Sequence, residues 1–214
     1  MTLCYGVLRR KFLSVVCLFC SALPTTPSHA FDKDAVALAR LASNTNTVLE
    51  CEGCDFSAAD LPGVRMNQAR LSGANFTGAN LRGVHLQHAD LTRARCDNAD
   101  LAAAYLYRTS FAHATLVAAD LTYAKLAQSD FSGTDLSRAN LTRVKLSATD
   151  LSNAILREAN FTGALLRKVN LAKSDLSGAN LTDAKLDDTP LSGAPLCHTV
   201  LPDGSISDRD CPTN

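Results

Sequence analysis

The chain has 214 residues, 46% of them apolar, no Trp, and a formal net charge of zero. A chain of this length is usually one domain with appendages. Nucleic-acid-binding domains usually carry a basic excess, so the charge balance favours neither nucleic-acid binding nor an acidic mimic of DNA, and we expect no nucleic-acid partner.

Residues 1–30 have the pattern of a secretory signal peptide. A basic start at residues 9–11 precedes the apolar run FLSVVCLFCSAL, and the small-x-small cleavage pattern SHA ends at Ala30. The apolar run is too short to cross a bilayer, and we expect no transmembrane segment in the mature chain. The signal peptide predicts that the protein is exported to a bacterial periplasm or secreted. The paired arginines resemble a twin-arginine signal, with an ordinary export signal as the alternative.

Residues 31–50 predict a helical N-terminal cap. The segment FDKDAVALARLASNT, residues 31–45, has a helix start at Asp34 and an apolar face supplied in part by Val36, Leu38 and Leu41. Unpaired strand edges invite aggregation, so we expect this helix to cover the first part of the segment that follows.

From residue 51 to residue 198 the sequence repeats every five residues, in units such as ANFTG, ADLTR and TDLSR. We call the central Leu or Phe of each unit position i. From Phe56 to Leu196, position i is Leu, Phe, Met66 or Cys96, and position i−2 holds Ala, Val, Thr, Ser or Cys54. A helix would scatter these positions around its axis, and a flat strand would alternate them between faces. The chain must therefore turn at every repeat, with i and i−2 inward and i−1, i+1 and i+2 facing water.

The tandem A-[DN]-L-x-x pattern resembles the pentapeptide repeat proteins. The resemblance implies an all-β solenoid, a right-handed quadrilateral β-helix with four repeats per coil and about seven coils at the β-sheet spacing. The repeats would span residues 51–198, with a C-terminal cap at 199–214. At position i−1, Asp and Asn recur mostly every tenth residue, from Asp60 to Asn180, and can bond backbone at tight turns.

Two cysteine pairs are candidate disulfides. Cys51 and Cys54 fall at positions i and i−2, which favours a structural disulfide over a redox pair or half of a zinc site. A redox pair normally lies at a helix N-terminus, and zinc would need two more ligands. Cys197 and Cys211 bracket the turn sequence LPDGS, whose flanks HTV and SIS predict a hairpin over the last coil. Cys96, in the leucine column, predicts a buried thiol.

Residues twenty positions apart should lie above one another on successive coils, and one such set forms a basic and partly aromatic stripe. Its members are Arg65, His85, His88, Tyr105, Tyr107, Arg108, Lys125 and Lys145, and no acid joins them before Asp187 and Asp188. One interpretation is a site for an anionic partner such as a polysaccharide, a phospholipid headgroup or an acidic protein. The other is a solvated face where Lys and Arg occupy positions that Asp does not.

The sequence has no nucleophile triad, phosphate loop or metal motif, so we expect no enzyme activity, cofactor or metal. The favoured function is an exported structural or binding scaffold of the cell envelope that presents a rigid face to a protein or an anionic polymer. Dimerisation is left open. One alternative is a DNA mimic that interacts with gyrase, as in some family members with acidic surfaces. The other is a thiol–disulfide protein using Cys51 and Cys54.

Overall fold

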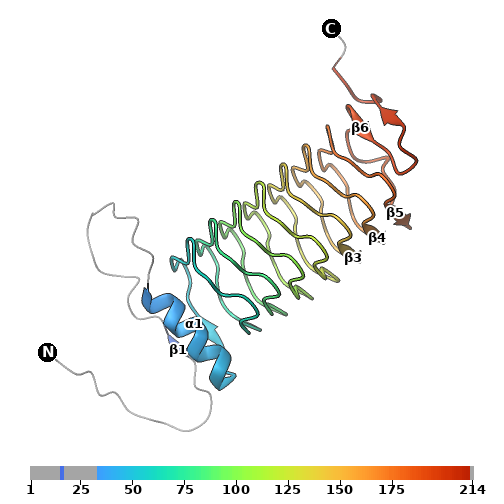
Figure 1. Cartoon of the computed structure of the whole chain (residues 1–214). Helices are drawn as coiled ribbons and strands as arrows, with labels where there is room; N and C mark the ends of the chain where they lie inside the picture. The colour runs from blue at the N-terminus through green and yellow to red at the C-terminus, as the bar shows by residue number, and fades with distance from the viewer. Residues whose placement is uncertain (1–14, 17–32, 213–214) are drawn as a thin grey trace, which may run out of the picture.

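The computed structural model describes residues 15–16 and 33–212, which form a rod with a helix at one end and a small hairpin at the other (Figure 1). The elements are β1 (Val15–Val16), α1 (Lys33–Thr45), β2 (Leu49–Glu50), β3 (Lys145–Ser147), β4 (Leu165–Arg167), β5 (Lys185–Asp187), β6 (Thr199–Val200) and β7 (Ile206–Ser207). The predicted signal peptide lies outside the described residues apart from β1, which pairs in parallel with β2. No helix in the described part of the chain combines the length and apolar content needed to cross a membrane.

A twenty-residue coil organises the rod. Parallel bridges join most i−1 residues to the residue twenty positions further on, from Glu50 and Arg70 at one end to Asn180 and Val200 at the other. Most of these bridges are isolated because each side of the coil is only a few residues long. Longer runs occur where β3, β4 and β5 stack in register. Four repeats of five residues therefore complete each coil.

A turn between successive sides of the coil explains how a five-residue repeat keeps its position i facing inward. The N–H at position i+3 donates to the carbonyl of position i, as Ala59 does to Phe56 at 3.0 Å. The i+2 residue has a positive φ, for example 61° at His88 and 53° at Arg108. A positive φ at the third residue is the feature of a type II turn. Each turn redirects the chain so that the next position i faces the same interior.

Positions i and i−2 form the core, as their composition predicts. In these columns only Val64, Leu186 and Leu191 are half-buried, and the others are buried. Phenylalanines stack between coils, with ring centroids 4.6 Å apart for Phe56 and Phe76. Most buried hydroxyls at i−2 donate to carbonyls of the preceding coil, as Thr134 does to Phe111 O at 2.8 Å. Among the outward positions, the small side chain of Ala102 is buried too.

Helix α1 packs on the first coil through Val36 and Leu38 of the expected apolar face, together with a row of alanines that was not expected. Ala35, Ala39 and Ala42 are almost completely buried, whereas Leu41 is 50% exposed and Leu38 is half-buried. The prediction that Leu41 belongs to the apolar face is therefore wrong. Residues four and three apart share one helix face, and the small alanines let that face approach the coil closely.

The C-terminal segment forms a hairpin beside the last coil. β6 and β7 pair antiparallel, and Leu201 N–H donates to Ser205 O at 2.7 Å across the turn. Val200 also forms a parallel bridge with Asn180, so β6 continues the coil stack. A disulfide joins Cys197 to Cys211 across the base of this hairpin.

Candidate interaction face

One side of the rod carries all eight residues of the predicted stripe, and we call it the basic face. Its i−1 column is continuous because parallel bridges link Arg65, His85, Tyr105, Lys125 and Lys145 in order. The column continues through Leu165 and Lys185 in β4 and β5. Neighbouring members are one inter-strand spacing apart, about 4.8 Å.

Strand alternation directs these side chains outward. In β3, Lys145 is exposed, Leu146 is buried and Ser147 is half-buried. Successive side chains of a strand point to opposite faces, so positions i−1 and i+1 emerge on the same side. Tyr105 and Tyr107 flank the buried Leu106 in the same way, and Arg108 follows at the turn.

A stack of three side chains lies at the centre of the i−1 column. The rings of His85 and Tyr105 are nearly parallel, 10° apart, with centroids separated by 4.5 Å. Lys125 Nζ lies 4.3 Å from the centroid of the Tyr105 ring. Cation–π contacts of this kind contribute about 0.5–1 kcal/mol at exposed sites, so the stack restrains the lysine while leaving it exposed.

His85 is held neutral by its surroundings. Burial lowers its pKa below the usual value, and the charges of Arg65 and Lys125 lower the pKa further. Folding therefore favours the neutral imidazole of His85. The contribution of His85 to the stability of the folded protein is fully present above the ordinary histidine pKa, and it is lost as the pH falls through the lowered pKa of the folded state. At neutral pH the positive charge of this column comes from its lysines and arginine.

We predict that Lys125→Gln raises the pKa of His85, because one of the two cations that disfavour the imidazolium is removed. An NMR pH titration of the His85 ring measures the shift. Lys173→Gln is the matched control, since Lys173 lies on another side of the coil and should leave the His85 titration in place. An unchanged His85 pKa in Lys125→Gln would show that the coupling is absent.

A second cluster beside the stack fixes Arg108. Its guanidinium carbon lies 5.1 Å from the Tyr107 ring centroid, and the His88 ring meets Tyr107 edge-on. Gln128 Oε1 accepts hydrogen bonds from Arg108 Nε at 2.7 Å and from Tyr107 Oη at 2.9 Å. Gln128 was not among the residues predicted from sequence, although its spacing of twenty residues from Arg108 places it next in the same column.

The ends of the basic face differ from its centre. Near α1, Arg65 lines a polar pocket of 190 Å³ with Asn46, Asn67 and Gln68 among its walls. Beyond Lys145, Leu165 is 40% exposed and interrupts the charged column. The dense aromatic and basic part therefore runs from His85 to Lys145.

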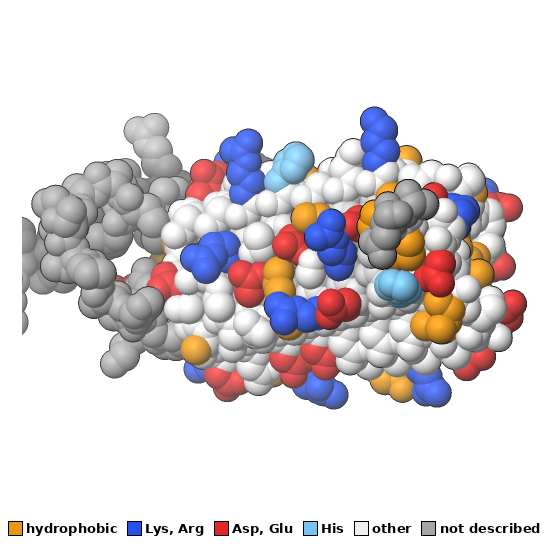
Figure 2. All heavy atoms as spheres, turned by 90° about the horizontal axis from the view of Figure 1, so that it is seen from above, with side chains coloured by type: hydrophobic (Ala, Val, Ile, Leu, Met, Phe, Trp, Pro, Cys, Tyr) orange, Lys and Arg blue, Asp and Glu red, His pale blue; other side chains and the backbone are white. Residues whose placement is uncertain are grey.

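The other sides of the coil use position i−1 for a structural purpose. There, Asp and Asn side chains accept a hydrogen bond from the backbone N–H two residues on, as Asp130 does from Ser132 at 2.9 Å. Similar bonds form at Asp90, Asp150, Asn160 and Asn180. The i−1 column of the basic face has no Asp or Asn. Its long side chains are thus available for contacts outside the rod. Basic and acidic side chains are interspersed on the side that Figure 2 presents.

The cysteines in the described part of the chain are divided between the core and the C-terminal hairpin. Cys51 and Cys54 form a disulfide, and both are almost completely buried, at 0% and 2% exposure. Cys96 is a free buried thiol whose pKa is raised, first by burial and then by the charge of Asp97. A thiol without water or a nearby cation is unreactive.

Comparisons with known proteins agree on the repeat. The family model for pentapeptide repeats matches residues 50–87, 85–122, 119–158 and 154–193. The chain is 30% identical to HetL of the cyanobacterium Nostoc sp. strain PCC 7120, a pentapeptide repeat protein involved in heterocyst differentiation regulation. That match covers 74% of this chain and 90% of HetL, with a TM-score of 0.44.

Two more distant solved structures also match. A pentapeptide repeat protein of the Arabidopsis thaliana thylakoid lumen is 27% identical, over 66% of this chain and 68% of its own, with a TM-score of 0.17. QnrB1, a plasmid-mediated fluoroquinolone resistance protein, is 16% identical, over 72% and 80% respectively, with a TM-score of 0.38. No curated protein matches the chain.

Proposed function

Because the chain belongs to the pentapeptide repeat family, as the match over residues 50–193 shows, we propose that it is an exported, non-enzymatic scaffold. In this proposal the basic face binds an anionic macromolecule of the cell envelope. The main support is the i−1 column of that face. It holds long basic and aromatic side chains, whereas on the other sides most i−1 positions hold Asp or Asn, whose side chains bond the backbone of the turns.

The architecture in this proposal is a rigid β-helix of about seven coils at the β-sheet spacing. Helix α1 closes one end, and the β6–β7 hairpin closes the other. Each coil contacts only its neighbours, so capped ends are needed to keep the stack soluble and closed. The buried alanine face of α1 and the bridge between Val200 and Asn180 support these capping roles.

Electrostatics favour an anionic partner. Lys125 and Lys145 form a parallel bridge on successive coils, one strand spacing of about 4.8 Å apart. This is shorter than the Debye length of about 8 Å at physiological ionic strength, so the two lysines act together on a polyanion. The stacked tyrosines restrain the cations and lower the ordering cost that binding would otherwise impose. The buried position of Cys51 and Cys54 argues against a thiol–disulfide function at that pair.

Charge reversal on the basic face tests the proposal. We expect Lys125→Glu/Lys145→Glu to weaken binding to immobilised dextran sulfate, a polyanionic probe, by about tenfold or more, equivalent to 1.4 kcal/mol. Binding of the wild-type protein should fall as salt is raised. Affinity and salt dependence are measured by surface plasmon resonance.

The matched control is Arg93→Glu/Lys173→Glu, which makes the same charge change on another side of the coil. We expect this variant to keep its affinity within about threefold, because exposed charges act mainly within a Debye length. Equal losses in both variants would indicate a bulk charge effect and overturn the basic face as the site. Protection of DNA gyrase from a fluoroquinolone by the purified protein would instead favour the DNA-mimic alternative.

A further inference from the structure

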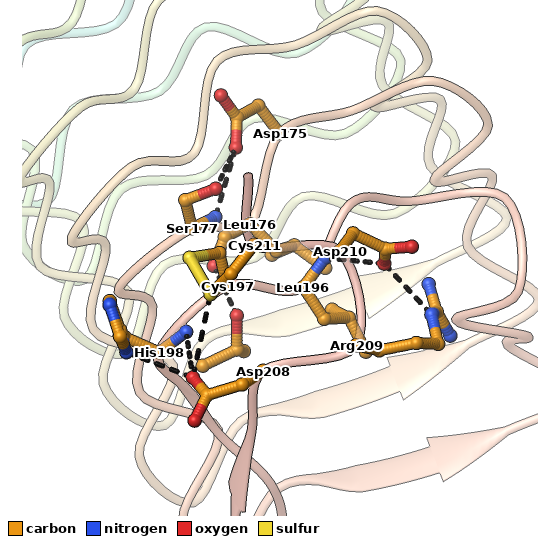
Figure 3. Close-up of a disulfide and its surroundings, with 11 residues drawn as sticks. Asp175, Leu176, Ser177, Leu196, Cys197, His198, Asp208, Arg209, Asp210 and Cys211 are labelled. Atoms are coloured by element: carbon orange, nitrogen blue, oxygen red, sulfur yellow. Dashed lines mark hydrogen bonds and ion pairs between the residues drawn. A yellow bond between two sulfur atoms is a disulfide. The ribbon is translucent and has the colours of Figure 1, made fainter. Parts of the chain in front are cut away.

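The C-terminal cap brings four metal-ligating side chains together. Cys197, His198, Asp208 and Cys211 each offer one ligand atom, and these atoms lie within 4.8 Å of one another. Figure 3 shows them converging from the last repeat and from the segment after β7. The two cysteines are joined by a disulfide, and the imidazole and carboxylate lie beside it.

Asp208 is the centre of this cluster. Its Oδ1 lies 2.8 Å from His198 Nδ1 and 3.5 Å from Cys211 Sγ. The same oxygen accepts a hydrogen bond from the backbone N–H of His198 at 3.0 Å, which fixes the carboxylate between the other side chains. The backbone thus positions the carboxylate, which lies between the imidazole and the sulfur atom of Cys211.

The cluster is also held together independently of the disulfide. Asp210 N–H donates to Leu196 O at 3.0 Å, and Leu196 N–H donates to Asp210 Oδ2 at 2.9 Å. Arg209 bonds Asp210 and the carbonyls of Leu191 and Ala194. These bonds tie the segment after β7 to the last coil (Figure 3). We therefore expect the four side chains to stay close together when the disulfide is reduced.

The two disulfides within residues 33–212 differ in their access to solvent. Cys197 and Cys211 are half-buried beside exposed His198 and Asp208, whereas Cys51 and Cys54 are inside the coil. Thiol–disulfide exchange requires direct attack on a sulfur atom. A soluble reductant therefore reaches the C-terminal pair first.

We propose that the reduced C-terminal cap is a zinc site whose ligands are Cys197 Sγ, Cys211 Sγ, His198 Nδ1 and Asp208 Oδ1. Zinc takes four such ligands in a tetrahedron, at about 2.0–2.3 Å, and thiolate with imidazole is the donor set that it prefers. The ion would replace the direct contact between His198 and Asp208. The cap then has two closed states, one with a disulfide and one with zinc.

The conversion of the disulfide state into the zinc state balances in electrons and protons. A dithiol reductant gives two electrons and two protons to the bond between Cys197 and Cys211, and its own sulfur atoms become a disulfide. The two cysteine thiols release their protons to solvent as Zn²⁺ binds, and the metal changes no oxidation state.

The test uses the full chain, reduced with tris(2-carboxyethyl)phosphine, which ends as the phosphine oxide with oxygen from water. Titration with Co²⁺ should give the visible bands of a tetrahedral ion and a thiolate charge-transfer band, and Zn²⁺ should abolish both. We expect one ion per chain. The oxidised protein should give no such bands.

Variants locate the site. Cys51→Ala/Cys54→Ala should keep the bands, and Cys197→Ser/Cys211→Ser should lose them. His198→Ala and Asp208→Asn, which retain both cysteines, should weaken Zn²⁺ binding at least tenfold. Circular dichroism checks that each variant is folded. The proposal fails if the reduced wild type gives no bands, if Cys51→Ala/Cys54→Ala removes them, or if neither His198→Ala nor Asp208→Asn weakens binding.

Discussion

Replacing Leu166 with alanine is expected to lower the free energy of unfolding by about 2–5 kcal/mol, while the same change at Leu165 should alter it by less than about 0.5 kcal/mol. The two residues are adjacent in β4. Leu166 is 1% exposed and packs in the i column, whereas Leu165 is 40% exposed on the basic face. The difference arises from the cavity left inside the coil and not from the chemistry of the substitution.

Urea denaturation followed by circular dichroism measures both variants. A stacked repeat protein can unfold in parts, so hydrogen exchange of β3, β4 and β5 should accompany the global measurement. We expect Leu166→Ala to accelerate exchange in these three strands first, since each coil contacts only its neighbours. Equal destabilisation by the two substitutions would contradict the inward direction of position i.

Deleting the whole coil of residues 121–140 should leave a folded, shorter rod, whereas deleting Thr122 alone should unfold the chain from that coil onward. The longer deletion joins Asp120 to Leu141 and keeps every later residue in its column. The single deletion shifts later residues by one place and turns Lys125 and Asp130 toward the core. An unpaired buried charge costs several kcal/mol, and many columns are disturbed at once.

Circular dichroism and limited proteolysis distinguish the two deletions. The variant without residues 121–140 should resist protease as the wild type does, with a lower overall stability because one coil is missing. The variant without Thr122 should be cleaved within the C-terminal half. Protease resistance of the Thr122 deletion would mean that a local bulge absorbs the shift and that the register is less strict than the bridges indicate.

The repeat made most of the coil predictable from sequence. A period of five is incompatible with a helix or a flat strand, so the inward direction of i and i−2 follows from steric periodicity alone. The role of Asp and Asn at i−1 was predictable for the same reason, because short polar side chains bond nearby backbone at turns. Asp130 and Asn160 form the bonds that this principle predicts.

The helix and the clusters were less predictable. Leu41 was expected in the apolar face of α1, but the contact uses three alanines beside Val36, since small side chains allow close approach. Gln128 was missed because a neutral amide gives no signal in a search for charges. The convergence of His198 and Asp208 on a disulfide depends on the path of the hairpin, which local sequence does not specify.

The five-residue period by itself determined which positions face inward and which residues recur at the same place twenty positions later. It could do so because neighbouring repeats obey one steric rule that needs no information from distant parts of the chain. The tertiary structure alone decided how the side chains of the basic face stack and which carboxylate meets His198. Those contacts depend on side-chain rotamers across coils and on how the chain ends fold back, both of which are set by packing between segments far apart in sequence.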